Sequence, residues 1–337
     1  MPADPLITIF GATGAQGGGL ARAILTRDKP AFRVRAVTRR PDGERARELA
    51  QLGAEIVTAD LDDAASVREA MGGAHAAYCV TNFWEHLSPD RELKQAQNMA
   101  EGARRAALRH VVWSTLEDTR RFLPADGSRM PVLMGHYNVP HFDAKGEANR
   151  FFTERGVPVT FLLTSFYWDN LILGMGPQRA PDGELVFVLP MGDRPLPGIA
   201  AADIGACAAG IFRQGESTIG RTIGISGEHL TGAQMASALS RALKEPVRHV
   251  AMSTQDYAKL GFPGADDLAN MFQFNHDFAD AFCAARPTAE SHALNPALMS
   301  FEAWLLGAGS QIQVPPKPRL SATSPARWTQ ARARGRS

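Results

Sequence analysis

The chain has 337 residues and a formal net charge of +1, and its 45% apolar and 21% charged residues suit a folded globular protein and exclude a wholly disordered one. It has no run of ~20 apolar residues that could span a membrane, and its three cysteines are too widely spaced for a disulfide framework or a zinc site. Because the N-terminus also lacks the zones of a signal peptide, we expect a cytoplasmic protein without a metal site, a membrane contact or a nucleic-acid surface.

The first half of the chain alternates short β-rich runs with segments whose apolar residues recur every three or four positions. The predicted strands are residues 6–10, 34–38, 55–59, 76–81 and 110–114. The predicted helices are residues 18–26, 44–52, 66–71 and 89–108. Strands that alternate with helices in this way form βαβ units. Because such crossovers are right-handed, the pattern predicts an α/β fold with a doubly wound parallel sheet of the Rossmann type.

The second half is less regular and favours a smaller cap or substrate domain that is interleaved with the sheet. Strands are predicted at residues 156–166, 185–189, 221–226 and 247–252. Helices are predicted at residues 169–173, 202–212, 231–243, 254–260 and 266–275, with Pro-Gly breaks at 180–183 and 189–198. We expect a dinucleotide-binding domain over residues 1–165, whose core also receives later segments, and the cap domain over 166–308. Residues 309–337 are rich in Pro, Ser and Arg and predict a disordered basic tail.

A glycine-rich turn follows the first predicted strand. Gly11, Gly14 and Gly17 stand three residues apart, where the apolar strand ends and a helix begins. This spacing allows a tight turn, close approach of the backbone to a diphosphate, and close packing of the helix on the sheet. Free N–H groups and the dipole at the start of the helix then hold the phosphates. The pattern predicts a dinucleotide site here, and a merely flexible turn is the alternative.

The end of the second strand indicates which dinucleotide binds. An NAD site usually has an acidic residue there, which accepts hydrogen bonds from the ribose. This chain has Thr38, Arg39 and Arg40, and its next carboxylate is Asp42. A guanidinium can hold the 2′-phosphate of NADP(H) through two hydrogen bonds, whereas a carboxylate would repel it. We therefore expect NADP(H) with Arg39 on its phosphate; two solvated arginines at a strand end are the alternative.

Further motifs follow along the chain: GATGAQGG (11–18), VTRRP (37–41), TADLDD (58–63), VTNFWE (80–85), HFDAKGE (141–147), YWDNL (167–171) and KLGFPGADDLANMF (259–272). Together they resemble the NmrA-like family, an atypical branch of the short-chain dehydrogenase/reductase fold, and most closely its NADPH-sensing members. The resemblance spans roughly residues 5–306. HFDAKGE and GFPGADDLANMF resemble this branch alone, whereas all Rossmann relatives share the glycine loop.

The resemblance also implies a set of cofactor contacts around the dinucleotide. They are Gly11, Thr13, Gly14, Ala15, Gln16 and Gly17 in the loop, Arg39 on the 2′-phosphate, Asp60 and Leu61 beside the adenine, Thr81, Asn82 and Phe83 on the ribose and nicotinamide side, Lys145 near the nicotinamide ribose, and Ser165, Phe166, Tyr167 and Trp168 closing over the nicotinamide. For Asp60, a role as a turn residue or helix cap is an equal alternative.

The catalytic residues of this fold are incomplete in this chain. A typical reductase uses Tyr and Lys one helical turn apart, and the Tyr exchanges a proton as hydride moves. Here the helix begins near Pro140, and the corresponding pair is His141 and Lys145. Tyr137 falls in the preceding loop. Ser114 ends the fifth strand, where the family's ordinary enzymes keep a catalytic serine, so the catalytic candidates are Lys145, His141 and Ser114.

Two functions follow from these residues. The resemblance favours a redox sensor that binds NADP(H) without efficient turnover and changes its self-association or its contact with a regulatory protein. The alternative is an NADPH-dependent oxidoreductase acting on quinones or other small carbonyl compounds, with His141 as proton donor. An epimerase with bound NAD is disfavoured by Arg39 and the missing tyrosine. Asp266 and Asp267 are interpreted as acids that complement a helix dipole, rather than as a catalytic pair.

Overall fold

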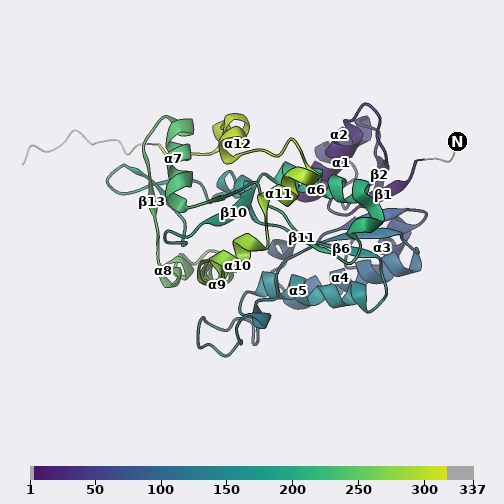
Figure 1. The fold of residues 1–337 in the computed structure, drawn as a ribbon, viewed down its shortest axis with the longest axis horizontal. Coiled ribbons are helices and arrows are strands. Elements are labelled where there is room, and N and C mark those ends of the chain that lie inside the picture. The colour runs from purple at the N-terminus through teal and green to yellow at the C-terminus, as the bar shows by residue number, and fades with distance from the viewer. Residues whose placement is uncertain (1–3, 317–337) are drawn as a thin grey trace, which may run out of the picture.

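The computed structural model describes residues 4–316, which form two parts lying side by side (Figure 1). The first part is a seven-stranded parallel sheet with the strand order β11-β6-β5-β4-β1-β2-β3. This order confirms the predicted doubly wound α/β fold. The strands are β1 (Leu6–Ile9), β2 (Arg33–Thr38), β3 (Glu55–Thr58), β4 (Ala76–Cys79), β5 (His110–Thr115), β6 (Val159–Leu163) and β11 (Thr222–Gly224).

Helices cover both faces of this sheet, as parallel strands that are apolar on both sides require. One face packs against α1 (Ala15–Leu25), α2 (Glu44–Gln51), α6 (Ala201–Gln214) and α11 (Thr288–Leu294). The other face packs against α3 (Ala64–Met71), α4 (Pro89–Arg105) and α5 (Pro140–Thr153). Helices α1 and α6 approach so closely that a Cβ on Gly205 would lie only 2.0 Å from the backbone nitrogen of Leu20. Only glycine fits at this position.

The second part contains two three-stranded sheets and most of the remaining helices. One sheet has the order β12-β10-β7 and the other the order β13-β9-β8. Its strands are β7 (Phe166–Tyr167), β8 (Gln178–Arg179), β9 (Leu185–Val188), β10 (Leu196–Ile199), β12 (Glu228–Leu230) and β13 (Val247–Val250). Its helices are α7 (Gly232–Leu243), α8 (Thr254–Ala258), α9 (Ala265–Asp277), α10 (Ala279–Ala284) and α12 (Phe301–Ala308).

Several predicted elements differ in the structure. The strand predicted at residues 156–166 is two strands, β6 and β7, which belong to different sheets. The break predicted at 189–198 contains the start of β10, whose Pro197 lies in the central strand of its sheet, a rare position for proline. The helix predicted at 169–173 is a short 3-10 helix at Trp168–Leu171, and α1 begins at Ala15 rather than at residue 18.

The tail predicted to be disordered over residues 309–337 is packed at its start. Gly309–Gln311 form a 3-10 helix, and Ile312 is buried. Arg179 donates from Nε to the backbone oxygen of Pro315 at 2.8 Å. The remainder of this predicted tail, residues 317–337, lies outside the described part of the chain. Between residues 4 and 316, no helix combines the length and the apolar character needed to cross a membrane.

Candidate functional site

The glycine turn links β1 to α1 at the carboxyl edge of the central sheet. The backbone nitrogen of Gly14 donates to the oxygen of Gly11 at 2.8 Å, and Gly11 has a φ of +63°. A Cβ on Gly17 would lie 2.5 Å from the oxygen of Gly11, so a larger residue does not fit there. Helix α1 starts with no side-chain cap and no acid in its first turn, which includes Ala15. These uncapped N–H groups and the open backbone fit an anionic diphosphate.

Two arginines border this turn. Arg39 follows β2 and forms an ion pair with Glu85, with side chains that are 52% and 44% exposed. Arg45, on α2, donates from Nη1 to the backbone oxygen of Thr13 at 3.0 Å. Sequence reasoning identified Arg39 and missed Arg45, because nothing in the local sequence shows that the first turn of α2 reaches back to the loop. A bound phosphate on Arg39 would compete with the Glu85 carboxylate.

Asp60 and Leu61 lie in the turn between β3 and α3. The Asp60 carboxylate accepts from the backbone nitrogen of Asp62 at 3.0 Å, which makes it a turn residue. The cap of α3 is Asp63, whose side chain accepts from the nitrogen of Ala65. The backbone oxygen of Leu61 accepts from Asn98 at 2.8 Å. The contact of these residues with the adenine stays a prediction.

Lys145 belongs to a buried ionic cluster. Its ammonium lies 2.7 Å from Oε1 of Glu92 and donates to Oγ1 and the backbone oxygen of Thr81 at 2.7 and 3.0 Å. Glu92 is fully buried, and its Oε2 lies 3.4 Å from Nε2 of His86. Burial alone would raise the pKa of Glu92, but the Lys145 charge, the nearby His86 and hydrogen bonds from Lys145 and Thr81 together lower it to about 2. Lys145 therefore fixes the segment that follows β4.

His141 is paired with an acid that sequence reasoning had interpreted differently. Its Nδ1 lies 2.6 Å from Oδ1 of Asp267, and its backbone nitrogen donates to Oδ2 of the same carboxylate at 3.2 Å. Asp267 is 1% exposed and His141 5% exposed. The predicted position of Asp267 at a helix N-terminus is confirmed, and its contact with His141 was not predicted. Asp267 does lie in the first turn of α9, but it also orients the imidazole of α5.

Aromatic side chains surround this imidazole. The Phe83 ring is buried, with its centroid 6.0 Å from that of His141. The Trp84 indole lies closer, at 4.7 Å, and is 43% exposed. Asn82, which lies between β4 and Phe83, is exposed, and its backbone oxygen accepts from the backbone nitrogen of Glu85 at 3.2 Å. Sequence reasoning could not decide between a pocket and a core role for Trp84, and its exposure argues against a core role.

Gln16 connects the phosphate loop to the buried Tyr78 and the half-buried Tyr167. The Tyr78 hydroxyl donates to its side-chain oxygen, and its side-chain nitrogen donates to the Tyr167 hydroxyl. Burial raises the pKa of Tyr78 well above its ordinary value, although a hydrogen bond with Ser114 opposes this effect. The candidate Ser114 is thus buried beside Tyr78, and Tyr167 ties β7 to the start of α1. Neither tyrosine contact was visible in the sequence, because both join distant segments.

The predicted closing segment, residues 165–168, divides between two environments. Ser165 is buried, and its Oγ has no hydrogen-bond partner among the described residues. Phe166 is half-buried in β7. Trp168 is 1% exposed and packs against Phe301, with ring centroids 5.3 Å apart. Trp168 therefore belongs to the core of the second part, and its contact with a nicotinamide stays a prediction.

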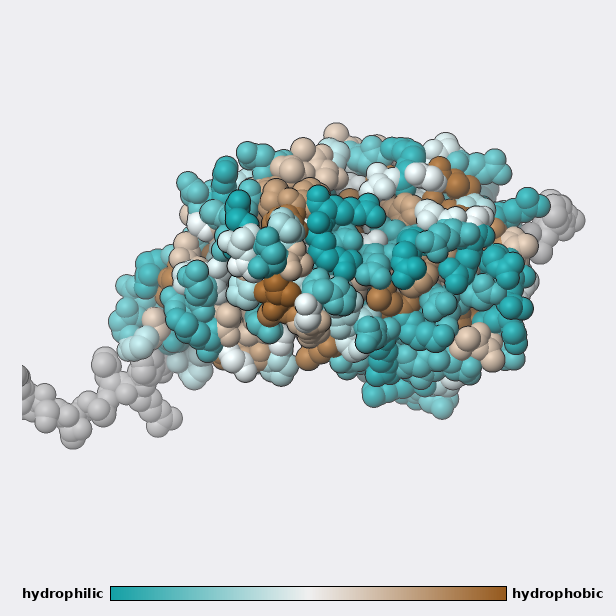
Figure 2. All heavy atoms as spheres, turned by 90° about the horizontal axis from the view of Figure 1, so that it is seen from below, coloured by the Kyte–Doolittle hydropathy of each residue, from teal (hydrophilic) through white to brown (hydrophobic). Residues whose placement is uncertain are grey.

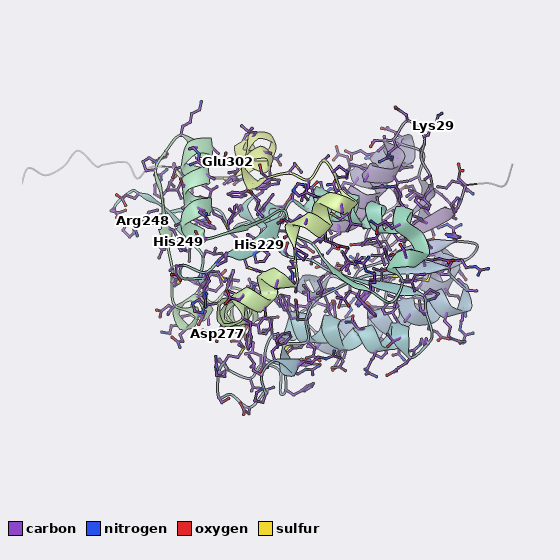
Figure 3. All side chains as sticks on the ribbon, in the orientation of Figure 1. Lys29, His229, Arg248, His249, Asp277 and Glu302 are labelled. Atoms are coloured by element: carbon purple, nitrogen blue, oxygen red, sulfur yellow. The ribbon has the colours of Figure 1, made fainter. Side chains whose placement is uncertain are left out.

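Other histidines and cavities lie away from this site. His229 and His249 lie in strands β12 and β13 of the second part (Figure 3) and bond through Nε2 to the backbone oxygens of Arg286 and Leu189 at 2.9 and 3.1 Å. A small cavity of about 170 Å³ is lined by Phe32, His110 and Phe212. Because His110 begins β5, this cavity is at the amino edge of the sheet, opposite the glycine turn.

Comparison with known proteins gives consistent matches over most of the chain. The NmrA-like family model matches residues 3–305. The oxidoreductase lnbB of Aspergillus flavus, an NmrA-like family domain-containing protein, is 25% identical over 309 residues, which cover 86% of this chain and 89% of lnbB.

Two solved structures share the fold. NmrA, a negative transcriptional regulator solved in complex with NAD, has a TM-score of 0.73 at 23% identity, covering 90% of this chain and 94% of NmrA. The triphenylmethane reductase of Citrobacter sp., solved with NADP(H), has a TM-score of 0.67 at 19% identity, covering 90% of this chain and 99% of the reductase.

Proposed function

The chain belongs to the NmrA-like family, and from this premise we propose that it is an NADP(H)-dependent oxidoreductase acting on a quinone or another small carbonyl compound. The observation that carries the proposal is the buried pair of His141 and Asp267, one helical turn before Lys145 on α5. An imidazole held by a carboxylate is suited to proton transfer. The glycine turn and the orphaned Oγ of Ser165 supply groups for a dinucleotide.

Each residue of the site has a separate role in the proposed reaction. When bound, a reduced nicotinamide would supply hydride. The N–H groups at the start of α1 hold the diphosphate, and Lys145 keeps Thr81 in place beneath the site. His141 holds a proton and delivers it to the oxygen of the acceptor as that oxygen gains charge. The exposed indole of Trp84 gives the acceptor an apolar wall, which suits a planar ring.

The choice of cofactor rests on Arg39. We expect NADP(H) to bind more tightly than NAD(H) by ~1.5–3 kcal/mol, the free energy of hydrogen bonds to a charged group. Arg39→Ala should remove most of this difference and leave the affinity for NAD(H) nearly unchanged, as calorimetry would measure. Arg40→Ala, its exposed neighbour, is the matched control and should keep the preference. Equal affinity of the native protein for both cofactors would contradict the assignment.

A redox sensor is the second candidate function, and a specific contact favours it. The Gln16 side chain joins the phosphate loop to Tyr167 in β7, which pairs with β10 of the second part. A dinucleotide that displaced or tightened this contact could bias the position of the cap, its self-association or a regulatory partner. The two candidates differ in one respect: a sensor holds NADPH without consuming it, and the absorbance at 340 nm follows its consumption.

A further inference from the structure

The acid beside His141 comes from a distant part of the chain. Asp267 and His141 are 126 residues apart in the sequence, and the carboxylate uses both of its oxygens on this one residue. Asp267 lies in the first turn of α9, where the helix dipole stabilises a negative charge. Its neighbour Asp266 is exposed and instead accepts from the backbone nitrogen of Asp267 at 2.9 Å. Of the two acids, Asp267 is therefore the one that contacts His141.

The contact determines which imidazole nitrogen carries the proton. A carboxylate only accepts hydrogen bonds, so Nδ1 of His141 must be the donor. In the neutral imidazole, Nε2 then keeps its lone pair, and it forms no hydrogen bond with any residue between 4 and 316. The rings of Trp84 and Phe83, 4.7 and 6.0 Å away, restrict rotation of the imidazole. Nε2 is therefore the nitrogen available to a ligand.

The segment that carries Asp267 also packs closely against the indole of Trp84. Gly264 precedes α9 with a φ of +81°, and a Cβ there would lie 2.8 Å from Cζ3 of Trp84. This glycine lets the start of α9 approach the indole closely. The same approach brings Asp267 to His141. The second part of the molecule thus completes a site whose other groups come from the central sheet and its helices.

We propose that Asp267 is the positioning residue of this site: it holds His141 with a proton on Nδ1, so that Nε2 faces the acceptor. The inference rests on the proposed function. In the reaction, a carbonyl carbon of the acceptor gains hydride from the reduced dinucleotide, which is oxidised. The carbonyl oxygen takes the Nε2 proton of the imidazolium. His141 is left neutral with Nδ1–H on Asp267, and water returns the proton to Nε2.

Two measurements test the inference on the full chain. Nitrogen NMR of histidine-labelled protein, with the His141 signal assigned by its loss in His141→Gln, reports the tautomer in the absence of any acceptor. We expect Nδ1–H in the native protein. In Asp267→Asn, the amide oxygen must accept from the backbone N–H of His141, which can only donate. The amide NH2 then donates to Nδ1, so we expect a shift of the imidazole proton to Nε2. The second measurement is the reduction of 9,10-phenanthrenequinone by NADPH. In Asp267→Asn, its kcat should fall ~10²-fold with little change in KM, because this is the usual effect of losing a general acid.

Asp266→Asn is the matched control and should keep both the tautomer and the turnover. A native His141 in the Nε2–H form would overturn the inference, and this result needs no variant to fold. Native turnover that persists in a folded Asp267→Asn would also overturn it, while leaving the proposed function intact. A native protein that binds NADPH and has the expected tautomer, but reduces no acceptor, would instead contradict the proposed function and with it the role of Asp267 in proton transfer.

Discussion

Gly14→Val is expected to abolish binding of NADP(H) and NAD(H) while the protein remains folded. The backbone of Gly14 has φ −90°, which valine adopts, and an added Cβ would lie 3.1 Å from the oxygen of Gly11. The branched side chain would occupy the approach to the first N–H groups of α1. Because each lost hydrogen bond to a charged phosphate costs ~1.5–3 kcal/mol, losing two should raise the dissociation constant ~10²–10⁴-fold. Calorimetry measures this change.

Gly17 provides the contrasting variant. A Cβ there would lie 2.5 Å from the oxygen and 2.8 Å from the carbonyl carbon of Gly11, so Gly17→Val should distort the turn and lower the melting temperature. Gly14→Val should leave the melting temperature of the unliganded protein nearly unchanged. Retention of native cofactor affinity in a folded Gly14→Val would mean that the diphosphate binds elsewhere.

Removing either member of the Glu92–Lys145 pair should destabilise the protein strongly. Glu92 is fully buried and Lys145 is 9% exposed, so each single variant leaves a buried charge without its main partner. Breaking such a pair costs ~3–5 kcal/mol. We expect Lys145→Met and Glu92→Gln each to lower the free energy of unfolding on this scale in denaturant titrations. The double variant Glu92→Leu/Lys145→Met should lose less free energy of unfolding than the two single variants lose together. Additive losses would show that the pair is not coupled.

The same pair predicts a dependence on pH. The pKa of Glu92 is lowered from 4.5 to about 2 in the folded protein, because the Lys145 charge and the hydrogen bonds outweigh the effect of burial. A lowered pKa in the folded state gives stability that is present above pH 4.5 and is lost as the pH falls toward about 2. The Glu92→Gln variant should show a smaller loss of stability over this interval, and an unchanged loss would contradict the assignment.

Local sequence patterns predicted the central sheet because its signals are local. The βαβ alternation, the glycine turn at Gly11–Gly17 and the Pro140 helix start are each complete within a few residues of chain. In the second part, β9 and β13 were predicted, but β8, β10 and β12 were missed and β7 was merged with β6. Strands β7 and β8 have two residues each, which is too short for an apolar alternation, and Pro197 gives β10 the signature of a break.

The contacts that define the chemistry of the site were not predictable from local patterns. Asp267 was correctly expected at a helix start, but nothing in its neighbourhood shows that α9 docks on α5. Glu92 has the sequence context of an ordinary acid in the first turns of a helix, and only the fold places it beside Lys145. Gln16 was assigned to the dinucleotide loop from its local sequence, which shows nothing of the hydrogen bonds that its amide forms with Tyr78 and Tyr167.

We propose that the carboxyl edge of the sheet is an active site in which His141 moves a proton. The most direct test of this claim is the absorbance at 340 nm of NADPH incubated with the native protein and with His141→Ala, across a panel of quinones and aldehydes. We predict sustained, acceptor-dependent NADPH oxidation by the native protein that falls ~10²-fold in His141→Ala, with unchanged affinity for NADPH. Constant absorbance with every acceptor, in native protein shown to bind NADPH, would contradict the claim and leave the redox sensor as the function of this fold.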